Sequence, residues 1–544
     1  MTGVVGLAAV GGVAARDQKS GERQQASNMQ ASAPKQNVSD TDKAEETGGA
    51  ESGKDDRGDR AGKDGKDDRA GKGDRDGKGK RFEDRERVKE VPCDTDKLID
   101  AITLANQTDG TTLKLAEHCT YTLTRHDEWG NGLPRINQPI TLKGHKTQVE
   151  RDSTAKPFRI LNVGPGGELT LKGLTIKGGQ LEDDKKKDDS KPRVRWGSKG
   201  SATAPTTAPE AANAAPGTPA VAPQAAAAPQ AAAVPGAGEP GSEATPAPWP
   251  TGGHGHTPTE GAGLLVHQGG RAVVEHSTFV QNHAPGDGGA IANFGATRID
   301  RTLIERNSAG GFGGGIFNAG ALQVKESEVA RNSAEEGGGG IANGSSGQYG
   351  IEGGTVYLFK SKISHNRTAG DGGGLADNGG TTSASHSEFT DNTAGSDVGG
   401  VLANVDSQLT LKHVLVAKNS TQGRAGGIGI GEGTKAVIEH SLVKENVSDG
   451  DGGGIFNFGF TVLRDTEVLA NQAVGRYAQA GGIFNDGGKV NLIQSRVAFN
   501  FSTKEPGGIF TNNDRVDIDS KSTVVDNRPT NCLGSPVVPD RCFG

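Results

Sequence analysis

The sequence from about residue 260 to the C-terminus consists of one short unit repeated at a nearly fixed period. Each unit contains a Gly-rich motif such as Gly-Gly-Gly-Ile-Phe-Asn and, later, an aliphatic residue, two variable residues and Asn. The Asn that closes the unit recurs at spacings of 25, 25, 34, 26, 27, 27, 25, 29 and 27 residues. A unit this short cannot bury a hydrophobic face alone, so successive copies must stack on one another. The repeat therefore predicts a solenoid.

The residues before each closing Asn follow the pattern of a β-strand. Ser or Thr usually stands five residues before the Asn, an apolar residue three before it and another eight before it. These offsets place side chains on one face with a period of two, broken by a turn. Gly, with 86 copies among 544 residues, is too frequent for helix interiors. We therefore predict an all-β fold, a single parallel β-helix of roughly 12 coils.

Stacked coils should place the closing Asn residues in one internal ladder. An Asn amide can bond the equivalent amides above and below it, which satisfies buried polar groups at a turn. The Ser and Thr residues should form a second column, and the triple-Gly segment should supply positive φ angles at the tightest corner. The predicted ladder consists of Asn282, Asn307, Asn332, Asn366, Asn392, Asn419, Asn446, Asn471, Asn500 and Asn527.

Two of these motifs carry a family resemblance. Gly-Gly-Ala-Ile at 288–291 and Phe-x-x-Asn at 279–282 and 389–392 resemble the paired motifs of the polymorphic outer-membrane protein repeat. The likeness covers roughly 260–531 and, less clearly, 90–180, although most copies have Ile or Val in place of Phe. It implies a secreted right-handed parallel β-helix repeat protein, commonly a surface protein or adhesin. Many members continue into a membrane β-barrel, and we do not expect one here after the last repeat.

Composition divides the chain into segments of different character. An apolar run resembles a truncated secretory signal that lacks its basic beginning, and a charged tail has too few apolar residues for a core. A helix over 94–106 should cap the first coils, and an Ala/Pro-rich insertion should be disordered. The expected segments are 1–15 (truncated signal), 16–90 (disordered tail), 91–180 (cap and first coils), 181–258 (disordered insertion), 259–531 (main repeats) and 532–544 (C-terminal cap loop).

Four cysteines form two local pairs, Cys93 with Cys119 and Cys532 with Cys542. Their even number, and their places at the two ends of the predicted solenoid, favour disulfides that pin terminal caps in an oxidising compartment. Free thiols are the alternative, and the sequence has no Cys-x-x-Cys motif of the kind that binds zinc. We therefore expect a secreted, extracellular or cell-wall-associated protein.

Carboxylates at the Gly-rich turns are the first candidates for catalysis. Asp287, Asp371 and Asp451 each precede a Gly-Gly pair, and we expect other residues, Val398 among them, in the intervening coils. Carboxylates two or more coils apart lie about 10–15 Å from one another, too far for a glycosidase pair. Asp before Gly more simply favours a turn, with occasional calcium binding as the remaining option.

A second candidate cluster lies in an early, irregular coil. It contains His118, His126, Asp127 and Glu128. Such a group in a long loop suits acid–base chemistry, but the sequence identifies no further partner. Enzymatic activity therefore stays open, and we lean against it.

A row of phenylalanines offers a candidate binding surface. Phe456, Phe484 and Phe510 follow the inward-pointing Ile in three consecutive coils, and Phe317 does so earlier. Alternation along a strand predicts that these rings point outward and are exposed, at steps of about 4.8 Å. Such a row could hold a sugar chain or a protein partner. Alternatively, the rings merely stack on each other or lie beneath the C-terminal segment.

These observations favour a secreted or cell-surface binding or structural protein, adhesin-like, whose ligand is a polysaccharide, a cell-wall polymer or another surface protein. The alternative is an extracellular polysaccharide lyase or glycoside hydrolase. A net charge of −7 without a basic stripe argues against nucleic-acid binding. No stretch is long enough to span a bilayer as a helix.

Overall fold

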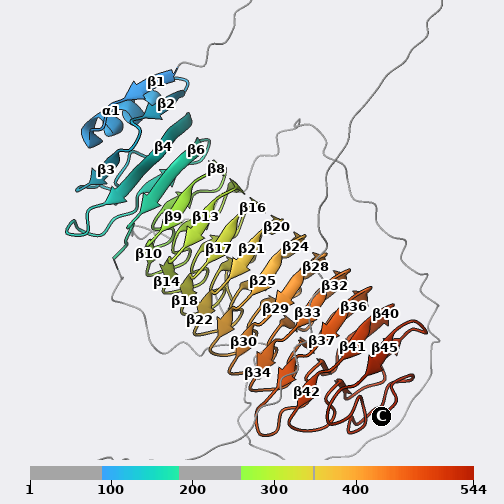
Figure 1. Ribbon diagram of the computed structural model, residues 1–544. Coiled ribbons are helices and arrows are strands. Elements are labelled where there is room, and N and C mark those ends of the chain that lie inside the picture. Colours follow the sequence, from blue (N-terminus) through green and yellow to red (C-terminus); the bar gives the residue numbers. More distant parts are fainter. Residues whose placement is uncertain (1–87, 183–258, 347–349) are drawn as a thin grey trace, which may run out of the picture. The chain divides into compact units, whose positions relative to one another are not determined.

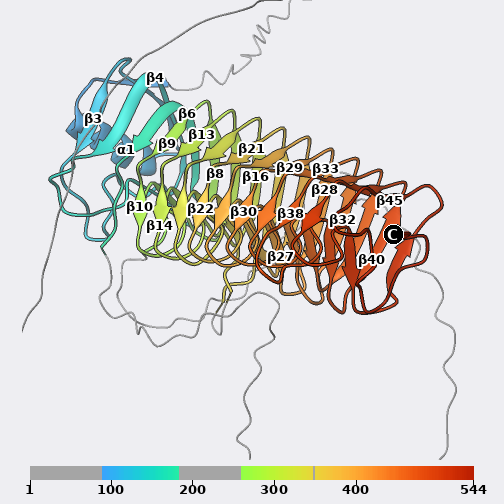
Figure 2. The ribbon, with the colours of Figure 1, turned by 60° about the horizontal axis from the view of Figure 1, so that its bottom comes forward.

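The computed structural model describes residues 88–182, 259–346 and 350–544. The predicted signal segment, nearly all of the predicted tail 16–90 and nearly all of the insertion 181–258 lie outside these residues. The described chain is an all-β parallel solenoid of about 13 turns, visible from two directions in Figures 1 and 2. The predicted fold class is confirmed.

The first coils are irregular and begin with the predicted cap. Helix α1 starts behind Asp94, whose side chain accepts a hydrogen bond from the Lys97 amide at 3.1 Å. The helix buries one apolar face that includes Leu98 and Ile102, and it contacts the first four strands. The elements of this region are β1 (Val88–Val91), α1 (Thr95–Asn106), β2 (Thr111–Leu115), β3 (Thr120–Leu123), β4 (Pro139–Arg151), β5 (Leu161–Val163) and β6 (Glu168–Lys177).

Most later coils contain four strands, and these stack on their equivalents in parallel. The first strand of each coil lies at the position of the Ile-Phe-Asn motif or its variants and belongs to a sheet of 11 strands. These strands are β5, β7 (Leu264–Val266), β11 (Ile291–Asn293), β15 (Ile316–Asn318), β19 (Ile341–Asn343), β23 (Leu375–Asn378), β27 (Val401–Asn404), β31 (Ile428–Ile430), β35 (Ile455–Asn457), β39 (Ile483–Asn485) and β43 (Ile509–Thr511).

The second and third strands of each coil belong to one sheet of 25 strands, because β4 and β6 are long enough to pair with both rows. The second-strand row is β8 (Arg271–Glu275), β12 (Ala296–Asp300), β16 (Ala321–Lys325), β20 (Thr355–Phe359), β24 (Thr381–Ser385), β28 (Gln408–Lys412), β32 (Lys435–Glu439), β36 (Phe460–Arg464), β40 (Lys489–Ile493) and β44 (Val516–Ile518). The third-strand row is β9 (Thr278–Val280), β13 (Leu303–Glu305), β17 (Glu328–Ala330), β21 (Lys362–Ser364), β25 (Glu388–Thr390), β29 (Leu415–Ala417), β33 (Leu442–Lys444), β37 (Glu467–Leu469), β41 (Arg496–Ala498) and β45 (Thr523–Val525).

A short fourth strand completes most coils and forms a sheet of nine strands before the Gly-rich turn. The coils on either side of the insertion stack directly, since Leu161 pairs with Leu264 and Glu168 with Arg271. The fourth strands are β10 (His283–Ala284), β14 (Ser308–Ala309), β18 (Ser333–Ala334), β22 (Arg367–Thr368), β26 (Thr393–Ala394), β30 (Ser420–Thr421), β34 (Val447–Ser448), β38 (Gln472–Ala473) and β42 (Phe501–Ser502).

The interior holds two hydrogen-bonded polar columns beside the stacked aliphatic core. From Asn282 to Asn527, the Nδ2 of each closing Asn donates to the Oδ1 of the next at 2.9–3.1 Å. The Ser and Thr column accepts backbone N–H groups in the same way, as Ser327 Oγ does from the Thr302 amide at 3.0 Å. These bonds satisfy groups that would otherwise be buried without partners.

A further Asn column, which the sequence analysis missed, closes the first strand of several coils. Asn293 Nδ2 donates to Asn318 Oδ1 at 2.7 Å, and Asn318 Nδ2 donates to Asn343 Oδ1 at 2.8 Å. Asn457 bonds Asn485 in the same manner at 2.8 Å. The signal was present, because these Asn residues end the repeated Ile-Phe-Asn and Ile-Ala-Asn motifs.

Both disulfides predicted from the sequence are formed. Cys93 bonds Cys119 beside the capping helix, and Cys532 bonds Cys542 in the C-terminal segment. Each therefore fastens one end of the solenoid, where a coil has a neighbour on one side.

Candidate ligand-binding surface

The phenylalanine row exists, but it is not the exposed surface that the sequence predicts. Phe456, Phe484 and Phe510 stack with ring centroids 4.8 and 4.3 Å apart and interplanar angles of 20° and 8°. Phe456 is only 1% exposed and Phe484 8%, and Phe510 is half-buried. The expectation of an exposed row was therefore wrong. Phe317, at 0% exposure, is equally buried, in a separate apolar cluster with Phe312.

The Gly-rich turn explains this burial. It folds back over the outer side of the first strand, so that its positive-φ residue lies against the residue four positions later. Ala425 and Ala480 occupy this turn position with φ of 62° and 53°, and both pack in one apolar cluster with Phe456 and Phe484. The rings thus form a second, outer core rather than a platform.

The turn carboxylates also lie closer together than expected. Backbone hydrogen bonds between the turns place Asp397, not Val398, level with Asp371 and Arg424, so two carboxylates occupy adjacent coils. Asp371 Oδ1 accepts the Asp397 amide at 2.8 Å. Asp397 in turn accepts the Arg424 amide at 2.6 Å and pairs with its guanidinium at 2.9 Å. The expectation of Val398 at this level was wrong, whereas Asp371 and Asp451 are separated by the coils of Asp397 and Arg424, as expected.

These carboxylates hold the turns together. Asp451 Oδ1 accepts the Gln479 amide at 2.8 Å, and Asp287 Oδ1 accepts the Phe312 amide at 2.7 Å, in the same coil-to-coil manner as Asp371. Burial raises the pKa of Asp371 and of Asp451. Each aspartate accepts a backbone N–H of the following coil, so the main role of this row is to join neighbouring coils.

The early histidine and carboxylate cluster is not assembled into a single site. Asp127 Oδ1 accepts the amides of Trp129 and Asn131 at 2.9 and 2.8 Å, which fixes the loop. His126 contacts the Asp127 backbone oxygen at 2.7 Å. His118 lies edge-on to His145 instead, with ring centroids 5.9 Å apart.

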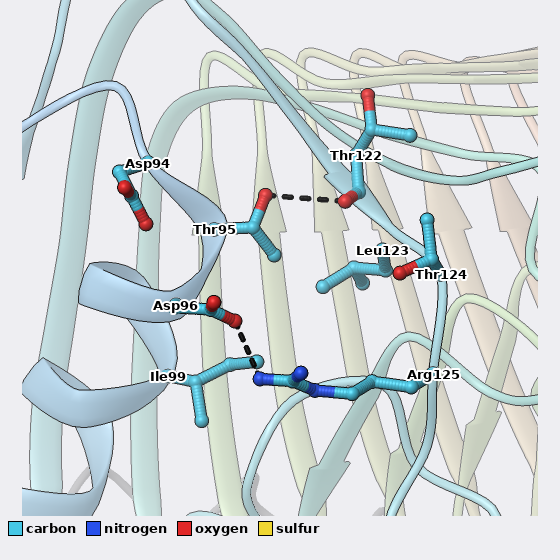
Figure 3. A pocket seen from close by; sticks show the side chains of 8 residues that line it. All are labelled: Asp94, Thr95, Asp96, Ile99, Thr122, Leu123, Thr124 and Arg125. Carbon is cyan, nitrogen blue, oxygen red and sulfur yellow. Dashed lines mark hydrogen bonds and ion pairs between the residues drawn. The ribbon is translucent and has the colours of Figure 1, made fainter.

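Two cavities lie at the ends of the solenoid. The first, of about 370 Å³, lies between the start of α1 and β3, where Arg125 pairs with Asp96 at 2.5 Å and Thr95 donates to the Thr122 carbonyl at 3.1 Å (Figure 3). The second, of about 500 Å³, lies between the last coil and the C-terminal segment. Within the described residues, no three His, Cys, Asp or Glu side chains are arranged to hold a metal ion.

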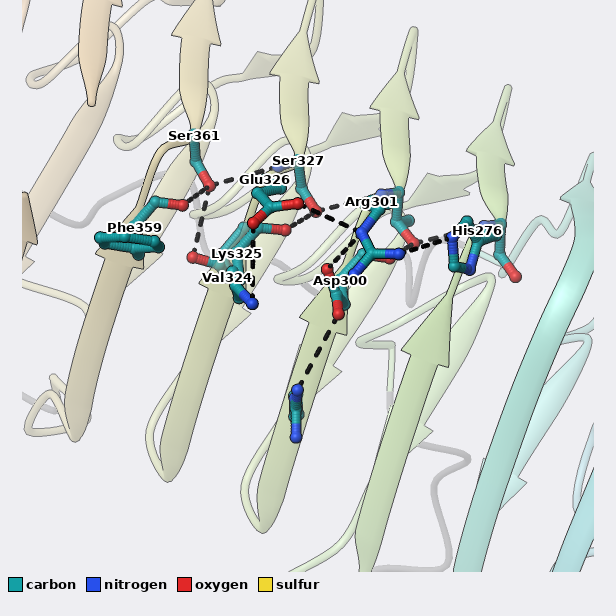
Figure 4. A network of polar contacts seen from close by, with 12 residues as sticks. His276, Asp300, Arg301, Val324, Lys325, Glu326, Ser327, Phe359 and Ser361 are labelled. Atoms are coloured by element: carbon teal, nitrogen blue, oxygen red, sulfur yellow. Dashed lines mark hydrogen bonds and ion pairs between the residues drawn. The ribbon is translucent and has the colours of Figure 1, made fainter. Parts of the chain in front are cut away.

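A row of polar side chains follows the corner between the second and third strands. Its residues have positive φ angles of 45–53° without being glycine, so their side chains stand outward at the same place in every coil. Arg301 links its two neighbours, contacting His276 at 3.1 Å and Glu326 at 3.2 Å (Figure 4). We call this row the corner column: His276, Arg301, Glu326, Lys360, His386, His413, His440, Asp465 and Gln494.

Exposed aromatic rings gather instead at the last coils. Tyr477, Phe499 and Phe501, here called the aromatic patch, are 69%, 54% and 45% exposed. The guanidinium carbon of Arg496 lies 5.2 Å from the Phe499 ring centre, and that of Arg476 lies 5.3 Å from the Tyr477 ring centre. No sequence signal singled out these rings, since none belongs to the repeated motif.

Backbone contacts bring the parts of the aromatic patch together. Phe501 pairs with Gln472 of the preceding coil. Further along, Thr503 Oγ1 donates to the Val474 carbonyl at 3.1 Å, and the Lys504 amide donates to the Ala478 carbonyl at 2.9 Å. The loop that carries Tyr477 therefore lies directly beside the segment that follows Phe501.

Comparisons with solved structures found distant likenesses. No protein-family model and no curated protein sequence matches the chain, so the resemblance to the polymorphic outer-membrane protein repeat stays a prediction. The mannuronan C-5 epimerase AlgE6 A-module of Azotobacter vinelandii covers 82% of this chain and 97% of its own, with 13% identity and a TM-score of 0.32. PfbA, a surface adhesin of Streptococcus pneumoniae, covers 73% of this chain and 86% of its own, with 10% identity and a TM-score of 0.30. Both are β-helical proteins.

In the part of the chain that the structure describes, no helix has the length and apolar character needed to cross a membrane.

Proposed function

We propose that the protein is a secreted or cell-surface β-helical binding protein whose ligand is a polysaccharide or cell-wall polymer. The observation that carries the proposal is the aromatic patch, in which Tyr477, Phe499 and Phe501 are exposed next to arginine side chains. Aromatic residues make up only 4% of the chain, and exposed apolar clusters mark interaction sites.

The chemistry of the patch suits a sugar chain. The faces of the aromatic rings can pack against the apolar C–H faces of sugar rings, as they pack against other apolar groups. The neighbouring guanidinium groups of Arg476 and Arg496 provide planar arrays of N–H donors for hydroxyl or acid groups. The two disulfides support an oxidising, extracellular compartment.

The test is a binding screen with the full chain against a glycan array and isolated cell walls. Replacing Tyr477, Phe499 and Phe501 together by Ala should weaken binding at least about tenfold, since contact-making aromatic residues commonly dominate binding energy. Trp129→Ala is the matched control, because Trp129 is 66% exposed at the opposite end of the solenoid. Unchanged binding by the triple variant would show that the aromatic patch is not the site, and the absence of any glycan or cell-wall binding by the wild-type chain would refute the proposal.

A polysaccharide lyase or glycoside hydrolase is the second candidate. In its favour, Asp371 and Asp397 occupy adjacent coils beside Arg424, and paired carboxylates serve glycoside hydrolysis. Against it, Asp397 is 3% exposed, and both carboxylates accept backbone N–H groups. Release of reducing or unsaturated sugar ends from a polysaccharide panel, abolished by Asp371→Asn, would favour the enzyme.

A further inference from the structure

Three consecutive members of the corner column are histidines. The rings of His386 and His413 have centroids 4.9 Å apart, and those of His413 and His440 are 5.0 Å apart and nearly parallel, at 13°. All three side chains are exposed. We call these residues the histidine column.

The fold fixes this spacing. Each histidine has a positive φ angle of 48–53°, and each donates its amide to a carbonyl of the next coil. The acceptors are the backbone oxygens of Lys412, Glu439 and Arg464, at 3.1, 3.0 and 2.9 Å. The Cα atoms of the three histidines therefore cannot move apart without breaking the backbone ladder, and any charge the imidazoles acquire accumulates along one line.

The charged groups around the histidine column differ between its ends. Lys360 precedes it in the corner column, and Lys412 directly precedes His413. At the other end, His440 Nδ1 lies 3.8 Å from Asp465 Oδ2.

Two glutamates flank the column. Glu388 opens β25 two residues after His386. Glu439 precedes His440 and is ion-paired with Arg464. Desolvation, followed by the positive charges of His386, His440 and Lys412, lowers the pKa of His413.

A shared metal ion does not fit this geometry. Zinc binds imidazole nitrogens at about 2.0–2.1 Å, so two ligands of one ion must converge. Parallel rings 5.0 Å apart point their nitrogens side by side rather than toward one centre.

The surface beside the histidine column is rich in hydroxyl groups. Strands β24 and β28 lead into the corners that carry His386 and His413, and they turn polar side chains outward. These residues are Thr381, Ser383, Ser385, Gln408 and Thr410. In the coil before them, Phe359 lies edge-on to His386 with ring centroids 5.7 Å apart, and Tyr357 is 38% exposed. Hydroxyl and aromatic groups together suit a sugar chain lying along the axis.

We propose that the histidine column is a pH-dependent binding site for an acidic polysaccharide that runs along the solenoid, with its carboxylates facing the imidazolium groups. This inference rests on the proposed function and adds the charge of the ligand and the condition for binding. Coils rise by about 4.8 Å each, so the column offers a line of regularly spaced positive charges. A polymer with regularly spaced acid groups offsets the repulsion among these charges. Because the charged form binds, affinity rises as pH falls through the histidine range.

The experiment measures binding of polygalacturonate, and of neutral dextran as a control polymer, to the full chain at about pH 5 and about pH 7.5 at constant ionic strength. Wild-type protein should bind polygalacturonate at least about tenfold more tightly at the lower pH, as expected for coupling to three imidazoles. The variant His386→Gln/His413→Gln/His440→Gln should lose this pH dependence. The control His118→Gln/His145→Gln changes two exposed histidines of an early coil and should retain it.

The outcomes separate this inference from the proposed function. If polygalacturonate binds but the triple histidine variant keeps the wild-type pH dependence, the histidine column is not the site and the inference alone fails. If double-stranded DNA gains affinity at low pH as much as polygalacturonate does, the assignment to polysaccharide is wrong. If no glycan or cell-wall polymer binds at either pH, the proposed function fails, and the inference fails with it.

Discussion

Asn343 Nδ2 donates a hydrogen bond of 3.1 Å to Asp377 Oδ1, so a carboxylate continues a ladder that the two preceding steps build from amides. Asp377 is fully buried and accepts further bonds from Thr382 Oγ1 at 2.6 Å and the Gly380 amide at 2.9 Å. Burial raises its pKa to about 6 despite these donors. A buried charge thus replaces a neutral group at this one step.

The first prediction follows from that pKa. A carboxyl group whose pKa is raised on folding binds protons more tightly in the folded state, so it costs stability as pH rises from about 4 to above 6. Asp377→Asn should remove this cost and raise the free energy of unfolding at pH 7.5 by up to about 3 kcal/mol, the value of about two pKa units. Thermal unfolding at pH 4 and pH 7.5 checks it. A variant less stable than wild type at both pH values would contradict it.

The second prediction concerns His267, a group whose pKa is lowered rather than raised on folding. Burial, together with the charges of Arg135 and Arg159, lowers the pKa of His267 to about 4. The unfolded chain therefore binds this proton more readily, and stability is lost as pH falls from about 6.5 toward 4. His267→Gln should flatten the stability profile in this window, measured as melting temperature against pH. The exposed His118→Gln should leave the profile unchanged; an identical effect of both variants would refute the assignment.

The third prediction tests the main Asn ladder. Asn419 donates to Asn446 Oδ1 at 3.0 Å and to the Phe389 carbonyl at 2.9 Å, and it accepts from Asn392 at 3.0 Å. Asn419→Ala leaves these buried partners without a hydrogen bond. Each unsatisfied group lowers the free energy of unfolding by about 1–3 kcal/mol. We expect at least about 3 kcal/mol lower stability by chemical denaturation. Lys435→Ala, at an exposed strand position, should change stability by less than about 0.5 kcal/mol.

The fourth prediction separates the buried phenylalanine row from the aromatic patch. Phe484→Ala removes a ring stacked between two others and should cost about 3–5 kcal/mol, as for a large core truncation. Polysaccharide binding by the folded variant should stay within about twofold of wild type, because the ring is not a contact surface. A stable Phe484→Ala protein with weakened binding would restore the idea of an exposed row. Phe543→Ala, 80% exposed, serves as the stability control.

The sequence determined the architecture because a repeat constrains every copy alike. Spacing predicted the coils and the positions that stack, from Asn282 to Asn527, and the terminal cysteine pairs followed from their places outside the repeat. Alternation also identified correctly which side of the first strand Phe456 occupies.

Tertiary structure decided what lies on the surface. Alternation distinguishes the inside of a coil from its outside, but it does not say whether a turn covers that outside, and the turn at Gly452 covers Phe456. Exact register between coils of unequal length placed Asp397, not Val398, level with Asp371. The stacking of His386, His413 and His440 likewise depends on the corner that each positive-φ residue forms. The local bend of the backbone, and not the distance in sequence, decides which side chains of successive coils become neighbours.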